Sequence, residues 1–270
     1  MHVGITMPTL KSTVLMLAII GGFMSLSLAQ ENQAYISIEY MKVKDGQAQS
    51  YLEAEQMWKK LHEVRKAEGH ILEWNLCRVI YPQGSERPYD YVTITVYPNY
   101  KALNTSFSLD LIKKAHPDGD PSAMMEKTSS SRDLVKGLLL QSSEILPPLS
   151  EDFDTKFIQI DYMKTPEMGE GAYLAVERDI WKKIHAQRQK AGKLGVWGVY
   201  SVMYPYGANE EFNMLTANFF ANWTQTGMGL DMSDAEKAGI NMDMEEVSEK
   251  TLASRSLVKS ELWERIEKVN

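Results

Sequence analysis

The sequence predicts an α+β protein made of two tandem βαββαβ units, because the chain repeats itself and each repeat alternates strand and helix patterns. At a constant offset of 123 positions, residues 58–100 and 181–223 are identical at 13 of 43 positions. A later block, 127–136 against 250–259, is identical at 7 of 10 positions. Two copies of one unit usually pack as one pseudo-symmetric body. We therefore expect an intrachain pseudo-dimer.

Each copy opens with a strand and continues with a long helix. Apolar and polar residues alternate over 35–41 and again in the second copy, and this period of two indicates a half-buried strand. The stretches 47–68 and 170–191 are rich in Ala, Glu, Lys, Gln and Leu, which favour helix. Each stretch is followed by a glycine, Gly69 or Gly192, where a positive φ ends a helix at little cost.

The rest of each copy completes the order β-α-β-β-α-β, which is the split βαβ unit. The remaining predicted elements are two strands (71–81 and 89–97, repeated at 194–204 and 212–220), a mostly helical stretch (100–128, repeated at 222–251) and a last strand that begins near Arg132 or Arg255. The predicted boundaries are a signal peptide over 1–29, a first unit over 30–145, a linker over 146–154 and a second unit over 155–270.

The N-terminus has the pattern of a secretory signal peptide. Lys11 precedes an apolar run that begins near Val14, and the small residues Ser27 and Ala29 form a cleavage site. A membrane anchor is the alternative, but the run falls short of the roughly 20 residues that span a bilayer. We expect an exported protein, periplasmic or secreted, with no membrane span in the mature chain.

Composition excludes several functional classes. Removing one Lys with the signal peptide leaves 29 − 1 = 28 basic against 36 acidic residues, a net charge of −8 that disfavours nucleic acid as a partner. The only cysteine, Cys77, excludes an intramolecular disulfide. His and Cys residues lack metal-ligand spacing, although a His with Glu39 or Glu177 remains an alternative cation site. We expect no cofactor.

The duplicated element order, with its long first helix, resembles the dimeric α+β barrel superfamily of ferredoxin-like proteins. That group includes the antibiotic-biosynthesis monooxygenases, the NIPSNAP-type proteins and the stress-responsive barrel cyclases. The resemblance covers nearly the whole mature chain, and no short catalytic signature of any one member is present. It implies that the two units pack sheet against sheet with the helices outside, and that ligands occupy a cleft between helix and sheet. Haem occurs in this superfamily, but nothing in the sequence singles out an axial ligand.

The first helix of each copy carries charged and imidazole side chains within its apolar stripe. At about 100° per residue, Arg65 projects from the middle of the stripe that contains Trp58 and Leu61. A buried arginine could clamp a carboxylate or enolate, a histidine could move protons and a tryptophan could stack on a ring. The residues expected to line the clefts are Tyr40, Trp58, His62 and Arg65 in the first copy, and Tyr162, Glu177, Trp181, His185 and Arg188 in the second.

Structural roles could explain the same residues. Arg65 and Arg188 could pair with an acid or cap strand carbonyls, and the tryptophans could fill core. The opposite strand face is a second candidate site, expected to point into the space between the two sheets; its polar residues are Glu39, Asp161, Thr93, Thr216, Thr95 and Asn218. These side chains could hold a polar ligand or a metal, or form a hydrogen-bond network between the units.

Three functions follow from these observations. The first is an exported, cofactor-independent barrel that binds a small aromatic or apolar organic molecule. The second is an enzyme on the same cleft, an oxygenase, isomerase or cyclase with His185, Arg188 and Glu177 as catalytic residues. The third is a structural or protein-interaction role. Because the first copy has Ala54 where the second has Glu177, catalysis predicts one active and one degenerate cleft. A monomeric pseudo-dimer and a homo-oligomer both remain open.

Overall fold

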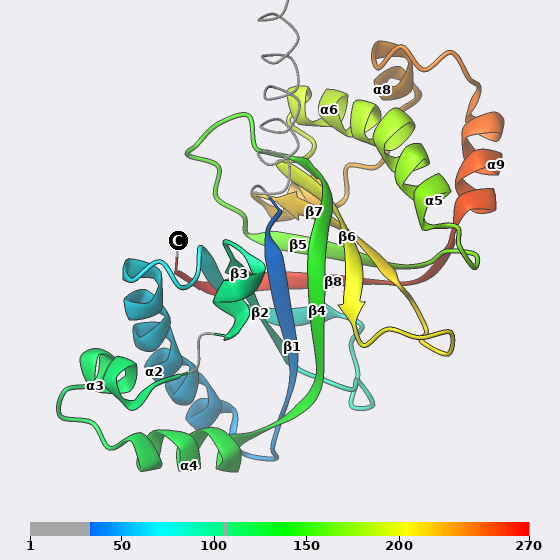
Figure 1. Ribbon diagram of the computed structural model, residues 1–270. Coiled ribbons are helices and arrows are strands. Elements are labelled where there is room, and N and C mark those ends of the chain that lie inside the picture. Colours follow the sequence, from blue (N-terminus) through cyan, green and yellow to red (C-terminus); the bar gives the residue numbers. More distant parts are fainter. Residues whose placement is uncertain (1–32, 105–106, 270) are drawn as a thin grey trace, which may run out of the picture. The chain divides into compact units, whose positions relative to one another are not determined.

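The protein has a mixed α+β fold around a closed β-barrel, as the computed structural model shows for residues 33–104 and 107–269 (Figure 1). The chain from Ala34 onward is one compact body. The predicted signal peptide over 1–29 lies outside the described residues. Within the described ranges, no helix has the length and apolar character needed to cross a membrane.

In this described part, eight strands close the barrel in the order β1-β3-β2-β8-β5-β7-β6-β4, and every neighbouring pair is antiparallel. The strands are β1 Tyr35–Val43, β2 Glu73–Tyr81, β3 Tyr91–Tyr97, β4 Arg132–Leu146, β5 Phe157–Lys164, β6 Val196–Tyr204, β7 Met214–Phe220 and β8 Ser256–Val269. The order β4-β1-β3-β2 in the first half (residues 34–146) recurs as β8-β5-β7-β6 in the second half (residues 157–269). Two seams, β2 with β8 and β4 with β6, join these four-strand groups.

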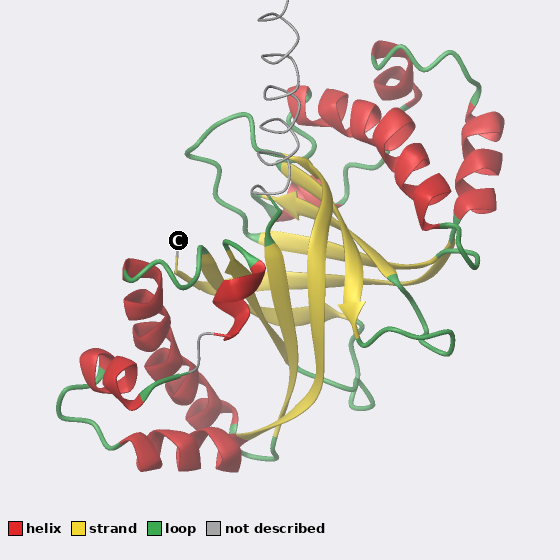
Figure 2. Cartoon of the chain, in the orientation of Figure 1, coloured by secondary structure: helices red, strands yellow, loops and turns green. Residues whose placement is uncertain are grey.

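The helices lie outside the barrel in two groups, one on each side (Figures 1 and 2). The first half contributes α2 Ala48–Ala67, the 3₁₀ turn η1 Tyr100–Asn104, α3 Leu109–Ala115 and α4 Pro121–Ser131. The second half contributes α5 Glu170–Val176, the π-helical segment η2 Glu177–Trp181, α6 Lys182–Lys190, α7 Trp223–Thr226, α8 Met232–Lys237 and α9 Met244–Ser254. As predicted, Gly69 and Gly192 follow the first helices with positive φ, at 74° and 71°.

The two faces of β1, β3, β5 and β7 are the reverse of the prediction. Ile36, Ile38 and Tyr40 of β1 point into the barrel and belong to its apolar interior, whereas Glu39 lies on the outer face that the helices cover. Strands on all sides shield the barrel interior from water, so the apolar faces of β1 and β5 are buried there. Helices cover the outer face only in part, and polar side chains can remain hydrated between helix and sheet.

Candidate functional site

A cleft lies between the outer face of the sheet and the first long helix in each half of the chain. The first cleft has a volume of about 190 Å³. Its polar and aromatic lining consists of Ser37, Glu39, Glu55, Trp58, His62, Arg65, Trp74, Thr93, Thr95, Tyr97, Phe107 and Arg132. The second cleft has a volume of about 270 Å³. Its corresponding lining consists of Gln159, Asp161, Glu177, Trp181, His185, Arg188, Trp197, Thr216, Asn218, Phe220, Thr226 and Arg255.

Most of the predicted site residues therefore come together. The first cleft contains Trp58, His62 and Arg65. The second cleft contains their counterparts Trp181, His185 and Arg188, together with Glu177. The polar residues assigned to the space between the sheets, such as Glu39 and Thr93, instead complete these same clefts. The prediction that they face the barrel interior is wrong because the strand faces are reversed.

Tyr40 and Tyr162 were also predicted in the clefts, and this placement is wrong. Both are buried inside the barrel, where their hydroxyl oxygens lie 2.9 Å apart. Tyr162 donates a hydrogen bond of 3.3 Å to Glu261. Burial raises the pKa of both phenols, so each keeps its proton at neutral pH. Neither side chain lines either cleft.

A histidine stacked between two tryptophans forms the aromatic wall of each cleft. The His62 ring lies 6.2 Å from the Trp58 centroid and 5.0 Å from that of Trp74. In the second cleft, the His185 ring is 5.9 Å from Trp181 and 5.2 Å from Trp197.

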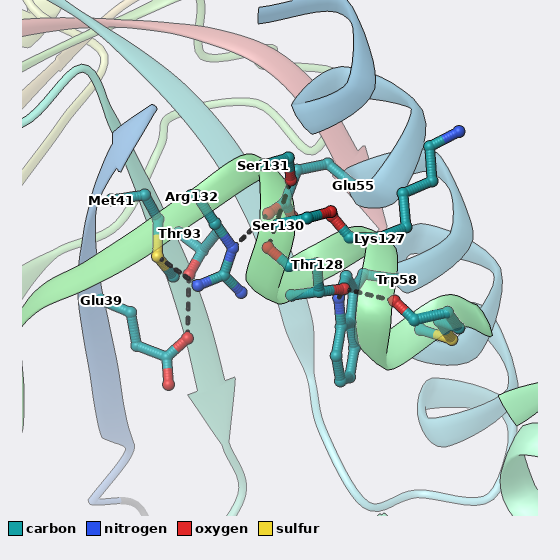
Figure 3. Close-up of polar contacts among 11 residues, drawn as sticks. Glu39, Met41, Glu55, Trp58, Thr93, Lys127, Thr128, Ser130, Ser131 and Arg132 are labelled. Carbon is teal, nitrogen blue, oxygen red and sulfur yellow. Dashed lines mark hydrogen bonds and ion pairs between the residues drawn. The ribbon is translucent and has the colours of Figure 1, made fainter. Parts of the chain in front are cut away.

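Hydrogen bonds fix the helix tryptophan of each stack. The Trp58 indole donates to the Thr128 hydroxyl at 3.0 Å, as Figure 3 shows. Trp181 donates to Thr251 at the same distance. Each indole is therefore held in place by a hydroxyl on the later helix of its own half, α4 or α9.

A buried guanidinium faces each histidine. Arg65 is 2 % exposed and Arg188 8 %, and the Nη1 of each lies 3.1 Å from Nδ1 of His62 or His185. An arginine only donates, so Nδ1 accepts and the neutral ring carries its proton on Nε2. Burial and the adjacent guanidinium lower the pKa of His62 and His185 to about 3. The histidines are therefore neutral at physiological pH, and the prediction that they move protons is disfavoured.

Neither guanidinium forms an ion pair with an acid among the described residues. Its Nε is buried and lacks a hydrogen-bond partner in both clefts. Arg188 donates to the carbonyl oxygen of Met228 at 2.9 Å, while Arg65 lies 4.7 Å from the Phe107 ring centroid. Asp234, whose charge acts on Arg188, is held by Lys193 at 2.8 Å. Each cleft thus contains a buried cation without a carboxylate counterion among the described residues, which costs free energy unless a ligand supplies one.

A carboxyl group with a raised pKa lies in each cleft. Glu55 and Glu177 are each 2 % exposed, and burial raises the pKa of both to about 7 despite the opposing charge of an arginine. Arg132 lies 3.4 Å from Glu55, and Arg255 donates to Glu177 at 3.3 Å. In Figure 3, the Arg132 guanidinium lies between Glu55 and Met41, next to the first cleft.

The presence of Glu55 overturns the predicted asymmetry between the clefts. Glu177 was aligned with Ala54, which left the first copy without an acid. The structure pairs it with Glu55, because the π-helical segment η2 inserts one residue between Glu177 and Trp181. A π-bulge is the usual way for a helix to absorb one extra residue. The difference in residue number between equivalent positions of the two copies is therefore 122 up to Glu177 and 123 from Trp181 onward.

Sequence reasoning missed Glu55, the counterpart of the predicted Glu177, and two pairs of cleft residues, Trp74 with Trp197 and Arg132 with Arg255. Both pairs are identical at the offset of 123, so the repeat contained the signal. Their strand and strand-end positions gave no indication that they face the first helix. In the described part of the chain, no group of three or more His, Cys, Asp or Glu residues could hold a metal ion.

No protein-family model and no curated protein matches this chain. Among solved structures, a provisionally named monooxygenase from Lactobacillus acidophilus NCFM aligns with a TM-score of 0.53 and 12% identity, over 88% of this chain and 96% of that one. A second provisionally named monooxygenase, from Fusobacterium nucleatum, aligns with a TM-score of 0.57 and 9% identity, over 88% and 94%. A haem-binding protein from Thermus thermophilus aligns with a TM-score of 0.46 and 11% identity, over 87% and 91%, a likeness too weak for inference. The first two show a likeness of fold alone, a mixed α+β fold with a closed barrel.

Proposed function

We propose that this protein binds a small planar organic acid in each of its two clefts. The observation that carries the proposal is the buried guanidinium of Arg65 or Arg188, which has no carboxylate partner among the described residues. A ligand carboxylate would supply the missing counterion and accept charge-assisted hydrogen bonds from it. The His Nε2–H is a second donor on the same wall.

The shape and size of the clefts favour a ligand with one ring. The stack of His62 with Trp58 and Trp74 offers a flat aromatic surface, and His185 has the same surroundings in the second cleft. An apolar cavity of about 150 Å³ is enough to hold benzene. Volumes of about 190 and 270 Å³ therefore accommodate a single ring with a carboxylate.

Benzoate titration tests this proposal. Isothermal calorimetry should detect two benzoate sites per chain, and benzamide, its neutral isostere, should bind more weakly. Arg188→Met should weaken one site by about 10- to 100-fold, the cost of a lost hydrogen bond to a charged group, and Arg65→Met the other. Lys183→Met removes one charge from the exposed face of α6 and serves as the matched control.

Thermal melts separate this role from a structural one. Removing an unpartnered buried charge should leave the melting temperature of Arg188→Met unchanged or raised. The double variant carries both Arg65→Met and Arg188→Met. If it bound benzoate as tightly as the parent, or if the parent bound benzamide and benzoate equally, the result would falsify the proposal. Unfolding of both arginine variants would instead support the structural explanation.

A proton-transfer enzyme on the same clefts is the second candidate. Glu55 and Glu177, with pKa values of about 7, suit a group that gains and loses a proton near neutral pH. The names of the two fold neighbours, both monooxygenases, also favour chemistry on a small organic molecule. A carboxyl in both clefts removes the expectation of a single active one. If the protein is an enzyme, Glu177→Gln should lose turnover and still bind benzoate. This result distinguishes an enzyme from a binding protein.

Export and internal duplication complete the proposal. The Lys11 and apolar-run pattern of the N-terminus supports export to the periplasm or the exterior. The recurrence of one strand order in residues 34–146 and 157–269 supports an intrachain pseudo-dimer of two ferredoxin-like units. Under this proposal the two clefts are duplicated sites that have diverged in size.

A further inference from the structure

The barrel interior contains a cavity of its own, separate from both clefts. Its volume is about 330 Å³, and its walls are mainly aliphatic, with Ile36, Ile38, Ile158, Ile160 and Leu215 among them. This is about twice the volume of a cavity that binds benzene. The cavity lies at the end of the barrel where β1 and β5 begin.

A polar network closes the opposite end of the barrel. The hydroxyls of Tyr40 and Tyr162 meet at 2.9 Å, and Glu261 accepts hydrogen bonds from Tyr162, Tyr89 and the Trp263 indole. All of these side chains are buried. The barrel cavity is therefore a pocket with one closed end rather than a channel.

One buried polar atom in the barrel cavity lacks a partner. Asn75 is 5 % exposed, and its Nδ2 donates to the Glu73 carboxylate at 2.8 Å. A carboxylate only accepts, so this contact fixes the amide orientation and leaves Oδ1 without a hydrogen-bond partner in the described part of the chain. Arg265, which is 9 % exposed and paired with Asp154, also lines the cavity. The cavity lining thus offers both an unused acceptor and a guanidinium.

The segment between β4 and β5 covers the cavity mouth. Pro148 and Phe153 both line the cavity. The Phe153 ring packs so closely on Gly195 that a Cβ at that position would overlap it. Only glycine at 195 allows this ring to lie where it does. The contact between Phe153 and Gly195 therefore fixes the position of the covering segment on the barrel.

We infer that the barrel cavity is a third binding site, which takes an uncharged aliphatic molecule bearing one hydroxyl group. A hydroxyl can donate to Asn75 Oδ1 and accept from Arg265, while the chain fills the space between the isoleucines. An acid is disfavoured because Glu73 is adjacent and Asp154 already neutralises Arg265. This inference is independent of the clefts, whose arginines call for an anion.

Asn75 and Arg265 both come from one side of the cavity, where β2 pairs with β8. At the offset of 123, the counterpart of Asn75 is Gly198 and that of Arg265 is Ser142. A Cβ at Gly198 would meet the Tyr200 hydroxyl oxygen at 2.6 Å, so an amide side chain there would displace the Tyr200 phenol. On that side the Tyr200 phenol lines the cavity instead, so the proposed orientation of the bound molecule, with its hydroxyl toward β2, depends on Asn75 and Arg265.

Two probes of equal length test the donor requirement. Isoleucine-methyl NMR spectra of the full chain are recorded during titration with 1-octanol and with heptyl methyl ether, which accepts but cannot donate. We expect 1-octanol to shift the methyl signals of Ile36, Ile94, Ile158 and Ile160 and to bind about tenfold more tightly than the ether. Octanoate should not perturb these methyl groups.

A single substitution completes the test. Asn75→Leu should lower the affinity for 1-octanol to that for the ether and leave ether binding unchanged. The parent-protein comparison of the two probes decides the matter even if this variant fails to fold. Equal affinities in the parent protein, or no shift of the barrel isoleucines up to the solubility limit of octanol, would overturn the inference.

Discussion

At the residue scale, the two clefts combine a neutral imidazole, a cation with no counterion in the described part of the chain and a carboxyl that titrates near pH 7. Each property comes from burial. Removal from water lowers the pKa of His185 to about 3 and raises that of Glu177 to about 7. The sequence identified the residue types, but their charges depend on the low-dielectric cleft that the fold builds around them.

The raised carboxyl pKa values predict how stability depends on pH. Glu55 and Glu177 have an ordinary pKa of 4.5 and a folded-state value of about 7. Between these values each carboxyl binds more protons in the folded than in the unfolded state, so it makes the free energy of unfolding fall as pH rises. His62 and His185, whose pKa is lowered from 6.5 to about 3, oppose this fall below about pH 6.5. For each carboxyl the loss between pH 5 and 8 should be about 2–3 kcal/mol, measured by urea unfolding.

Two variants check the source of this loss. Glu177→Gln stays neutral at every pH, so its free energy of unfolding should fall less than that of the parent between pH 5 and 8. Glu53→Gln is the control, since Glu53 lies on the exposed side of α2, where Lys127 lowers its pKa. In Glu53→Gln, the free energy of unfolding should change with pH as it does in the parent. An identical slope in Glu177→Gln would contradict the assignment.

At the element scale, the first helices of the two halves differ by one residue that the π-helical segment η2 absorbs. In α2, three positions separate Glu55 from Trp58, whereas four separate Glu177 from Trp181. Both acids nevertheless reach an arginine at the start of a strand, Arg132 or Arg255. A prediction based on 100° per residue could not find this correspondence, because a π-turn holds more residues than an α-turn.

Deletion of Asp179 tests this explanation. The side chain of Asp179 is 62 % exposed, and its removal gives η2 the α-helical spacing that α2 already has. We expect the free energy of unfolding to change by no more than about 1 kcal/mol. Deletion of Lys60 from the regular helix α2 is the control. It should turn Leu61 and Arg65 by about 100° off the buried face and cost more than about 3 kcal/mol. Equal losses would refute the role of η2.

At the scale of the whole molecule, the two seams make each half depend on the other. The β2–β8 and β4–β6 pairs satisfy strands that would be unpaired edges in either half alone. Both halves also contribute to the apolar barrel interior, with Ile38 and Leu138 from one and Ile160 and Leu215 from the other. Separation would therefore expose both hydrogen-bonding edges and apolar core.

Expression of the halves as separate chains should reveal this dependence. Residues 34–150 and 151–270 should co-purify as a heterodimer, because the seams form between chains as they do within one. Either half alone should self-associate or precipitate. Sedimentation velocity distinguishes these states, and a soluble, folded monomer of residues 34–150 would rule out the predicted dependence.

The sequence by itself determined the element order, the helix ends at Gly69 and Gly192, and most members of the two clefts. These features are local, since they follow from hydrophobic period, glycine conformation and the positions that one helix face brings together. Tertiary structure alone decided which strand face is enclosed, that Glu55 matches Glu177, and that Asn75 faces an apolar cavity. Those outcomes depend on barrel closure, which buries one face of every strand and pairs segments that lie far apart along the chain.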